Sequence, residues 1–359
     1  MQGNRLIPTT ALVGGTLAAA FYVALARHRQ AYTFAGKSVV ITGGSRGLGL
    51  VLARRLVNEG ARVALLARDV AELERARQDL LARGAVEGQV FAIPTDVRDQ
   101  TSIQSAITQA AEACGGIDVL INAAGIINAG PLQHMQVRDF ADTMDTHFWG
   151  TLYASTAALP WMRKKGHGRI VNIASLAGKL ALPHMGPYSA SKAAVASLSE
   201  SMRNELAAEN ICVTVVCPAT MRTGSHVNAT YKGRHRQEFT GLSLLSSLPL
   251  ISTDARVAAR KILDACRHGD AMLIIPSVFG ALPVLNLLMP NLVSHLLRLV
   301  NRFEPAPTSS KGDVLKEGWD SLSTLSPSAL TVLGDQATVE NNGLRGHAPL
   351  VTGAVTPSS

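Results

Sequence analysis

The chain has 359 residues, 47% of them hydrophobic and 4% aromatic, and its 34 lysines and arginines against 26 acidic residues give a net charge of +8. This length is enough to bury one large core or two small ones. The positive balance fits an anionic cofactor or membrane surface, while the scarcity of aromatic side chains argues against a nucleic-acid groove. Neither the four cysteines nor the histidines have the spacing of a metal site.

An uncharged apolar segment lies between Arg5 and Arg27. A helix needs about 20 residues to cross the hydrocarbon core of a bilayer, and this segment is just long enough. We therefore predict a membrane anchor in residues 1–30 that spans the bilayer with residues 6–26; a cleaved signal peptide and a helix packed on the domain are the alternatives. Positive charge is greater after the segment than before it, which predicts a single-pass protein whose main domain is cytoplasmic.

Seven short runs of β-branched and aliphatic residues follow, and the segments between them have helical periodicity. The runs are residues 37–42, 62–67, 89–95, 117–123, 168–174, 211–217 and 271–276. Continuous apolar runs are typical of parallel strands that are covered on both faces. The pattern predicts one α/β domain over residues 36–276, with a Rossmann-type, doubly wound, seven-stranded parallel sheet.

Two further segments follow the predicted domain. Residues 277–303 are apolar and uncharged up to Arg298, but Pro283 and Pro290 interrupt them. Because proline breaks helices, we expect an apolar helical extension that lies on a membrane, through residues 277–300, or covers a pocket of the domain, rather than a straight transmembrane span. Residues 304–359 are rich in Ser, Thr, Pro and Gly and have no sustained period, which predicts a mostly disordered tail.

A glycine-rich turn stands between the first predicted strand and the first predicted helix. Its sequence is Thr42-Gly43-Gly44-Ser45-Arg46-Gly47-Leu48-Gly49. Such a turn lets the backbone approach a pyrophosphate and directs the free N–H groups of the helix toward it. The turn therefore predicts a dinucleotide site, and a tight turn without a ligand is the alternative.

The residues after the second strand indicate which dinucleotide binds. A carboxylate there would hold the ribose 2′-hydroxyl of NAD, whereas positive charge accommodates the 2′-phosphate of NADP. The chain has Arg68 at this place and Arg46 within the glycine turn. Two guanidinium groups predict NADP(H), unless both arginines are solvated surface residues. Asp69 stands three residues before Glu72, a spacing that predicts a helix cap rather than a ribose ligand.

A tyrosine and a lysine stand four residues apart in the string Tyr188-Ser189-Ala190-Ser191-Lys192. On a helix this spacing places both side chains on one face. The ammonium of Lys192, helped by the positive charge of an oxidised nicotinamide, is then expected to lower the pKa of the Tyr188 phenol from its usual value of about 10, so that the phenol can transfer a proton near neutrality. Ser175 directly follows the fifth strand, where its hydroxyl could bind a substrate carbonyl.

The ordered set of TGGSRGLG, NAAG at residues 122–125, Ser175 and YSASK closely resembles the classical short-chain dehydrogenase/reductases over about residues 36–276. The resemblance implies that Tyr188 is the general acid/base, that Ser175 orients the reacting carbonyl or alcohol, and that Lys192 lowers the tyrosine pKa and holds the nicotinamide ribose. It also implies an adenine contact at Asp96. The expected cofactor contacts are Thr42, Gly43, Ser45, Arg46, Gly47, Leu48, Gly49, Arg68, Asp96, Val97, Asn122, Ala123, Gly125, Tyr188, Lys192, Pro218 and Thr223.

The chain departs from the family pattern at three places. Asn122-Ala123-Ala124-Gly125 replaces the usual NNAG, and Pro218-Ala219 replaces the usual Pro-Gly, both mild changes. In the string MDTHFWG, His147 occupies the place of an asparagine that helps to conduct protons from the lysine to solvent. His147 either takes over this relay and adds a pH dependence near neutrality, or it is a packed structural residue and the relay is impaired.

Two segments are expected to enclose the substrate: a wall loop of residues 178–187 and a lid of residues 224–252. Their apolar side chains are Leu180, Leu182 and Met185 in the wall loop and Leu242, Leu244, Leu245 and Leu248 in the lid. Together with the anchor, they favour a lipophilic alcohol, ketone or aldehyde of the steroid, retinoid or long-chain acyl type, although leucines packed on the core would have the same sequence.

Two competing functions stay open: a tethered 3-oxoacyl-thioester ketoreductase and a non-catalytic NADP(H)-binding sensor or assembly protein. We also expect a homodimer and no nucleic-acid partner.

Overall fold

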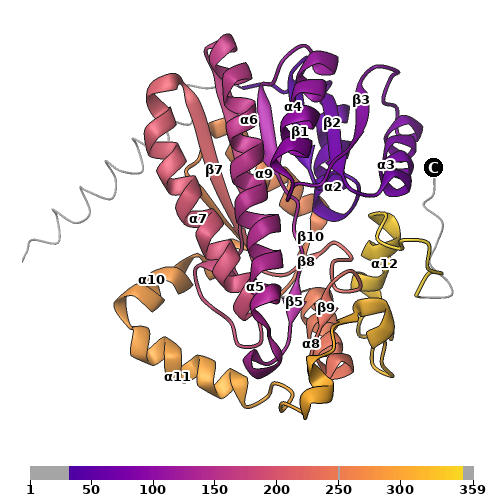
Figure 1. Cartoon of the computed structure of the whole chain (residues 1–359), viewed down its shortest axis with the longest axis vertical. Coiled ribbons are helices and arrows are strands. Elements are labelled where there is room, and N and C mark those ends of the chain that lie inside the picture. The colour runs from indigo at the N-terminus through magenta and orange to yellow at the C-terminus, as the bar shows by residue number, and fades with distance from the viewer. Residues whose placement is uncertain (1–31, 250, 351–359) are drawn as a thin grey trace, which may run out of the picture. The chain divides into compact units, whose positions relative to one another are not determined.

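The computed structural model describes residues 32–249 and 251–350 (Figure 1). The predicted membrane anchor in residues 1–30 lies outside the described residues. The chain divides into two units, Met1–Thr33 and Phe34–Ser359, and the second contains the whole α/β fold.

A seven-stranded parallel sheet forms the centre of this second unit, with the strand order β11-β7-β6-β4-β1-β2-β3. The strands are β1 (Ser38–Thr42), β2 (Arg62–Ala67), β3 (Val90–Pro94), β4 (Val119–Asn122), β6 (Gly168–Ile173), β7 (Ile211–Pro218) and β11 (Met272–Ile275). All seven predicted runs and the doubly wound sheet are confirmed. The order reverses between β1 and β4, and such a reversal opens a crevice at the carboxyl edge of the sheet.

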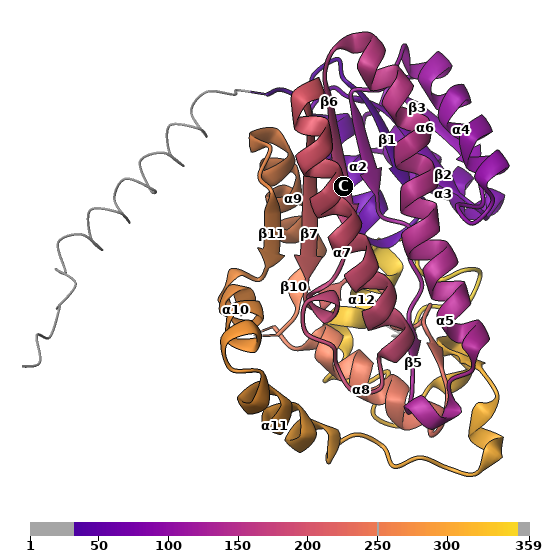
Figure 2. The same ribbon diagram turned by 60° about the vertical axis from the view of Figure 1, so that its left-hand side comes forward.

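Helices cover both faces of the sheet (Figures 1 and 2). One face carries α4 (Gln100–Cys114), α6 (Gly150–Lys165) and α7 (Gly186–Leu206), and the other carries α2 (Gly47–Asn58), α3 (Val70–Ala82) and α9 (Ala255–His268). This double cover explains the continuous apolar strands, because both faces are buried. Asp69 caps α3, as predicted, since its carboxylate accepts the Glu72 N–H at 2.8 Å.

Smaller elements lie beyond the carboxyl edge of the sheet. They are α5 (Val137–Met144), a π-helical turn (Asp145–Trp149), α8 (His235–Ser247), a two-stranded sheet of β8 (Met221–Arg222) and β10 (Thr253–Asp254), and a three-stranded sheet of β5 (Asn128–Ala129), β9 (Thr230–Tyr231) and β12 (Lys316–Glu317). The predicted lid therefore contains α8 and one strand of a small sheet.

The apolar segment after the main sheet forms α10 (Ala281–Leu288) and α11 (Pro290–Asn301). Among residues 32–249 and 251–350, no single helix is long and apolar enough to cross a membrane. The segments 277–288 and 290–301 pass this test only together, and they are bent by 118° relative to each other. Pro290 begins α11, and proline suits the first turn of a helix.

The prediction of a disordered tail is wrong for residues 304–350. This segment adds β12 to the small sheet and forms α12 (Val332–Glu340), which packs against α8. Buried hydroxyl groups join it to the lid: Ser243 and Ser326 share a hydrogen bond of 2.6 Å, and Ser247 donates to the Thr331 carbonyl at 3.1 Å. A segment held by such pairs has a polar composition and no apolar period, so it resembles a disordered one in sequence.

Candidate active site

A cavity of about 950 Å³ lies along the carboxyl edge of the sheet and continues beneath the lid. The predicted cofactor residues that line it are Gly43, Ser45, Arg46, Gly47, Leu48, Gly49, Arg68, Asp96, Val97, Ala123, Gly125, Tyr188, Lys192, Pro218 and Thr223. They follow different strands, and the in-register pairing of Thr42 with Asn122 and of Asn122 with Asn172 brings them to one edge. The structure therefore assembles most of the predicted site in one place.

Two predicted cofactor residues, Thr42 and Asn122, do not line the cavity. Both are buried at the ends of their strands. The Asn122 amide donates to Asn172 Oδ1 at 2.9 Å and to Ser155 Oγ at 3.1 Å. Its hydrogen bonds thus join β4 to β6 and α6, so Asn122 holds the sheet beside the cavity rather than facing it.

The glycine turn adopts a shape that larger residues would prevent. Gly43 has a φ of +69°, and a Cβ added there would lie 2.7 Å from the backbone of Ala124. A Cβ added at Gly49 would collide with the carbonyl oxygen of Gly43. The turn therefore packs closely on the loop after β4 and leaves the N-terminus of α2 facing the cavity. This arrangement fits the pyrophosphate of a dinucleotide.

A buried carboxylate, Glu72, organises the arginines at the adenosine end of the cavity. It accepts hydrogen bonds from Arg46 at 2.7 Å and from Ser45 Oγ at 3.1 Å. Burial lowers the pKa of Arg46, as do the nearby charges of Arg345 and Arg68, while Glu72 opposes these effects. In the sequence, Glu72 was singled out only for its spacing from the helix cap, and no role was predicted for Arg345.

Asp96 has a partner that the sequence analysis did not anticipate. Its carboxylate accepts a hydrogen bond from Arg98 at 2.6 Å, and this contact holds the pKa of Asp96 below its usual value. Both residues line the cavity. Asp96 therefore binds Arg98 and also lines the part of the cavity where an adenine contact is expected.

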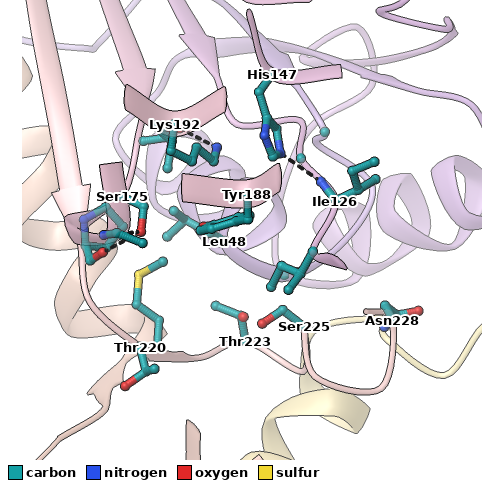
Figure 3. A pocket seen from close by; sticks show the side chains of 18 of the residues that line it. Leu48, Ile126, His147, Ser175, Tyr188, Lys192, Thr220, Thr223, Ser225 and Asn228 are labelled. Carbon is teal, nitrogen blue, oxygen red and sulfur yellow. Dashed lines mark hydrogen bonds between the residues drawn. The ribbon is translucent and has the colours of Figure 1, made fainter. Parts of the chain in front are cut away.

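Ser175, Tyr188 and Lys192 converge on the middle of the cavity (Figure 3). Ser175 follows β6, donates to the Pro218 carbonyl at 3.3 Å, and forms a hydrogen bond with Tyr188 that lowers the pKa of the phenol. Lys192 donates to the Ile173 carbonyl at 2.8 Å, and its Nζ lies 5.8 Å from the centre of the Tyr188 ring. The four-residue spacing on α7 places the tyrosine and the lysine together, as expected.

Burial opposes the expected effect of Lys192 on the Tyr188 pKa. Burial raises the pKa of Tyr188, and only the hydrogen bond with Ser175 opposes this rise. Burial also lowers the pKa of Lys192 to about 7. The interior thus disfavours the charged form of both side chains, the ammonium of Lys192 and the phenolate of Tyr188.

The buried lysine predicts a pH-dependent stability difference. The pKa of Lys192 falls from 10.5 in the unfolded chain to about 7 in the fold, so the unfolded chain binds more protons between these values. Lys192 therefore reduces the free energy of unfolding most at or below pH 7, and this effect fades toward pH 10.5. We expect Lys192→Met to raise the melting temperature at pH 6.5 and the gain to shrink by pH 9.5.

Thermal unfolding of the wild type and the variant, without dinucleotide, measures this difference. Lys164→Met, at an exposed position on α6, is the control and should give the same small change at each pH. A stability difference for Lys192→Met that does not vary with pH would contradict the burial argument.

His147 lies in the π-helical turn and is buried beside Lys192. Its Nε2 accepts the backbone N–H of Ile126 at 3.0 Å, so Nδ1 carries the proton and donates to Ser191 Oγ at 2.8 Å. Burial, with a smaller contribution from Lys192, holds the pKa of His147 well below its usual value. Both ring nitrogens are engaged and the ring is neutral, which agrees with the packed structural residue and not with a relay that titrates near neutrality.

The substrate end of the cavity is lined by apolar side chains from the wall loop, the lid and the apolar extension. Of the predicted lining residues, Leu180, Leu182, Met185, Leu242 and Leu245 lie on the cavity, whereas Leu244 and Leu248 do not. Leu248 follows the last residue of α8, and it is 40% exposed to solvent. The apolar extension adds Phe279, Leu282 and Val300 to the lining. It therefore covers the pocket, which was one of the two expectations for this segment.

Three ionisable side chains interrupt this lining: His184, Glu238 and Glu304. Their ligand atoms lie within 4.8 Å of one another, and His184 Nδ1 is 2.8 Å from Glu238 Oε1. The pKa of His184 is raised, because its contact with Glu238 outweighs the opposing effect of burial. This group has the spacing of a metal-ligand set, so the expectation of no metal stays a prediction.

Comparison with known proteins agrees with this geometry. The family model described as short chain dehydrogenase matches residues 37–232. The chain is 38% identical over 197 residues to the ketoacyl reductase HetN of Nostoc sp., covering 55% of this chain and 68% of that protein. It is 35% identical to the 3-ketodihydrosphingosine reductase of Mus musculus, covering 51% of this chain and 56% of that protein.

A solved dehydrogenase/reductase from Sinorhizobium meliloti has the same fold, with a TM-score of 0.59 and 31% identity over 68% of this chain and 94% of that one. The shared fold, the family match and the placement of serine, tyrosine and lysine around one cavity all indicate the same family. The chain belongs to the short-chain dehydrogenase family of oxidoreductases.

Proposed function

We propose that this protein is an NADP(H)-dependent oxidoreductase that interconverts an alcohol and a ketone or aldehyde on a lipophilic substrate. The convergence of Ser175, Tyr188 and Lys192 on one cavity is the observation that carries this proposal. A nicotinamide supplies or accepts the hydride at the carbonyl carbon when it is bound. The protein must then provide a hydrogen bond and a proton at the carbonyl oxygen.

The three side chains divide this work. In the reducing direction, Ser175 donates a hydrogen bond to the carbonyl oxygen, and Tyr188 gives up its phenolic proton as that oxygen becomes a hydroxyl. The proton returns to Tyr188 in the oxidising direction. Since burial lowers the Lys192 pKa to about 7, the lysine can replace the proton of the phenol near neutral pH.

Support for NADP(H) comes from the charges at the adenosine end. Arg46 and Arg68 line the cavity there, and the nearest carboxylates are engaged, since Glu72 bonds Arg46 and Asp69 caps α3. NAD would require a carboxylate free to bind the ribose hydroxyls. Guanidinium groups instead suit the 2′-phosphate.

Support for a lipophilic substrate comes from the apolar lining. Ketoacyl and 3-ketodihydrosphingosine reductases are among the similar proteins, and both names denote acyl-derived ketones. They favour the long-chain acyl type over steroids or retinoids. The tethered 3-oxoacyl-thioester ketoreductase is the second candidate, and the name of the Nostoc protein favours it.

Oxidation of NADPH and NADH by the purified full chain, followed with steroid, retinoid, long-chain 3-keto and 3-oxoacyl-thioester substrates, tests both candidates. We expect turnover with NADPH and long-chain ketones. Faster turnover with acyl thioesters than with free lipids would favour the second candidate. Turnover with NADH alone would contradict the cofactor proposal.

We also propose that the apolar extension contacts a membrane. Many of its large side chains face solvent, including Leu287 at 79%, Leu288 at 72% and Phe303 at 84% exposure. Such a concentration of exposed apolar side chains is typical of an interaction surface. The same extension lines the substrate end of the cavity, so a lipid could pass between the bilayer and the site.

A tryptophan at position 303 tests the membrane contact in the full chain. With Phe303→Trp, we expect brominated lipids in vesicles to quench the fluorescence more than in the wild-type protein. Equal quenching would contradict the contact. The cytoplasmic location, the single-pass anchor at residues 6–26 and the homodimer are further proposals, which protease protection and sedimentation in detergent can check.

A further inference from the structure

Residues 340–345, here named the C-terminal strap, lie over the glycine turn. The strap begins at the last residue of α12 and lies outside residues 37–232, which the family model matches. Gly47 donates its backbone N–H to the Asn341 carbonyl at 2.9 Å. Asn342 Nδ2 donates to the Ser45 carbonyl at 2.8 Å and to the Glu72 carbonyl at 3.0 Å. The strap is thus bonded to the backbone of the predicted phosphate-binding turn.

Further contacts join the strap to the elements on either side of the turn. Arg54 of α2 donates to the Glu340 carbonyl at 2.7 Å and to Asn341 Oδ1 at 3.0 Å. On the nicotinamide side, Asn228 Nδ2 donates to the Gly343 carbonyl at 3.0 Å, and Asn228 itself lines the cavity. The strap therefore bridges the adenosine half and the nicotinamide half of the site.

Arg345, the last residue of the strap, lines the cavity beside Arg46 and Arg68. Its Nε lies 3.3 Å from Glu72 Oε1, the same oxygen that Arg46 approaches at 2.7 Å. Arg345 and Arg68 both lower the pKa of Arg46 through their positive charge. The hydrogen bonds that Asn341 accepts and those that Asn342 donates already fasten the strap, whereas the guanidinium of Arg345 repels that of Arg46.

We propose that the C-terminal strap is part of the cofactor site and that Arg345 is a specificity residue for the 2′-phosphate of the dinucleotide. The inference rests on the proposed use of NADP(H). Arg46 and Arg345 share one buried carboxylate, and Arg68 adds a third guanidinium to the same part of the cavity, which leaves an excess of positive charge at its adenosine end. A dianionic phosphate would balance this charge and accept charge-assisted hydrogen bonds.

Calorimetric titration of the full-length protein with adenosine 2′,5′-bisphosphate and with 5′-AMP tests the proposal, because the two ligands differ only in the 2′-phosphate. Arg345→Ala is expected to weaken binding of the bisphosphate about tenfold and that of AMP less than about twofold. Arg345→Lys should recover part of the lost affinity, since it keeps the charge. Equal losses for both ligands, or no loss for the bisphosphate, would overturn the assignment.

Arg75→Ala is the matched control. Arg75 donates to Asn342 Oδ1 at 3.0 Å but does not line the cavity, so the variant weakens the strap without removing a guanidinium from the site. It should leave the preference for the bisphosphate within about twofold of the wild type. A similar selective loss in Arg75→Ala would mean that fastening of the strap, and not the charge of Arg345, carries the effect.

Binding of the two ligands by the wild-type protein distinguishes a failure of this inference from a failure of the proposed function. If it binds the bisphosphate no better than AMP, the NADP(H) proposal fails and the role of Arg345 fails with it. If the wild type prefers the bisphosphate and Arg345→Ala keeps that preference, only the role of Arg345 is wrong. Thermal unfolding of each variant shows whether it is folded under the conditions of the titration.

Discussion

Replacing Tyr188 with Phe is expected to lower kcat by about three orders of magnitude and to leave dinucleotide affinity within about threefold of the wild type. The substitution removes the phenolic hydroxyl and keeps the ring, so the wall of the cavity is preserved. Ser175 would still bind the carbonyl oxygen, but no positioned acid would supply its proton. Steady-state turnover and NADPH titration measure the two effects separately.

Tyr153→Phe is the matched control for this substitution. Tyr153 stacks on Trp149 with ring centres 5.8 Å apart, and it does not line the cavity. Its turnover should stay within about twofold of the wild type. If Tyr188→Phe retained wild-type turnover, the phenol would not be the acid. If it lost turnover but kept the full cellular role, the non-catalytic sensor would be favoured.

Replacing Gly49 with Ala should abolish measurable dinucleotide binding, with a loss of affinity of at least about 100-fold. A Cβ at this position would collide with the carbonyl oxygen of Gly43. Backbone cannot move aside as a flexible side chain can, so the turn or the start of α2 must shift. We expect the free energy of unfolding to fall by about 1–3 kcal/mol as well.

Gly280→Ala is the control for the glycine substitution. Nothing lies within 4 Å of a Cβ placed at Gly280, so the change in unfolding free energy should stay within about 0.5 kcal/mol. Titration with NADPH and thermal unfolding give both measurements. Wild-type affinity in Gly49→Ala would show that the close packing of the turn is not needed for the dinucleotide.

The strands and the central residues of the site could be predicted because each depends on local sequence. The apolar runs of β1 and β7 are continuous, since helices cover both faces of the sheet. The four-residue spacing of Tyr188 and Lys192 fixes their common face on α7. The order of the strands in the sheet depends on contacts between distant residues, and the sequence pattern did not predict it.

The features that sequence reasoning missed depend on partners far away in the chain. Burial among distant parts of the chain holds the pKa of His147 low, and Ile126 and Ser191 occupy its two ring nitrogens. The pKa of Lys192 depends on burial, which a residue's spacing does not reveal. The folded state of residues 304–350 depends on hydroxyl pairs with α8, such as that of Ser326 with Ser243.

The three-stranded sheet of β5, β9 and β12 draws its strands from three distant parts of the chain. Asn128 pairs with Thr230, and Thr230 pairs in turn with Glu317. During synthesis, the ribosome must therefore release β12 before this sheet can be completed, whereas all seven strands of the main sheet have emerged by residue 275. Completion of this small sheet is consequently a late event, and a message truncated shortly after β11 would encode Ser175, Tyr188 and Lys192 without the apolar extension and β12.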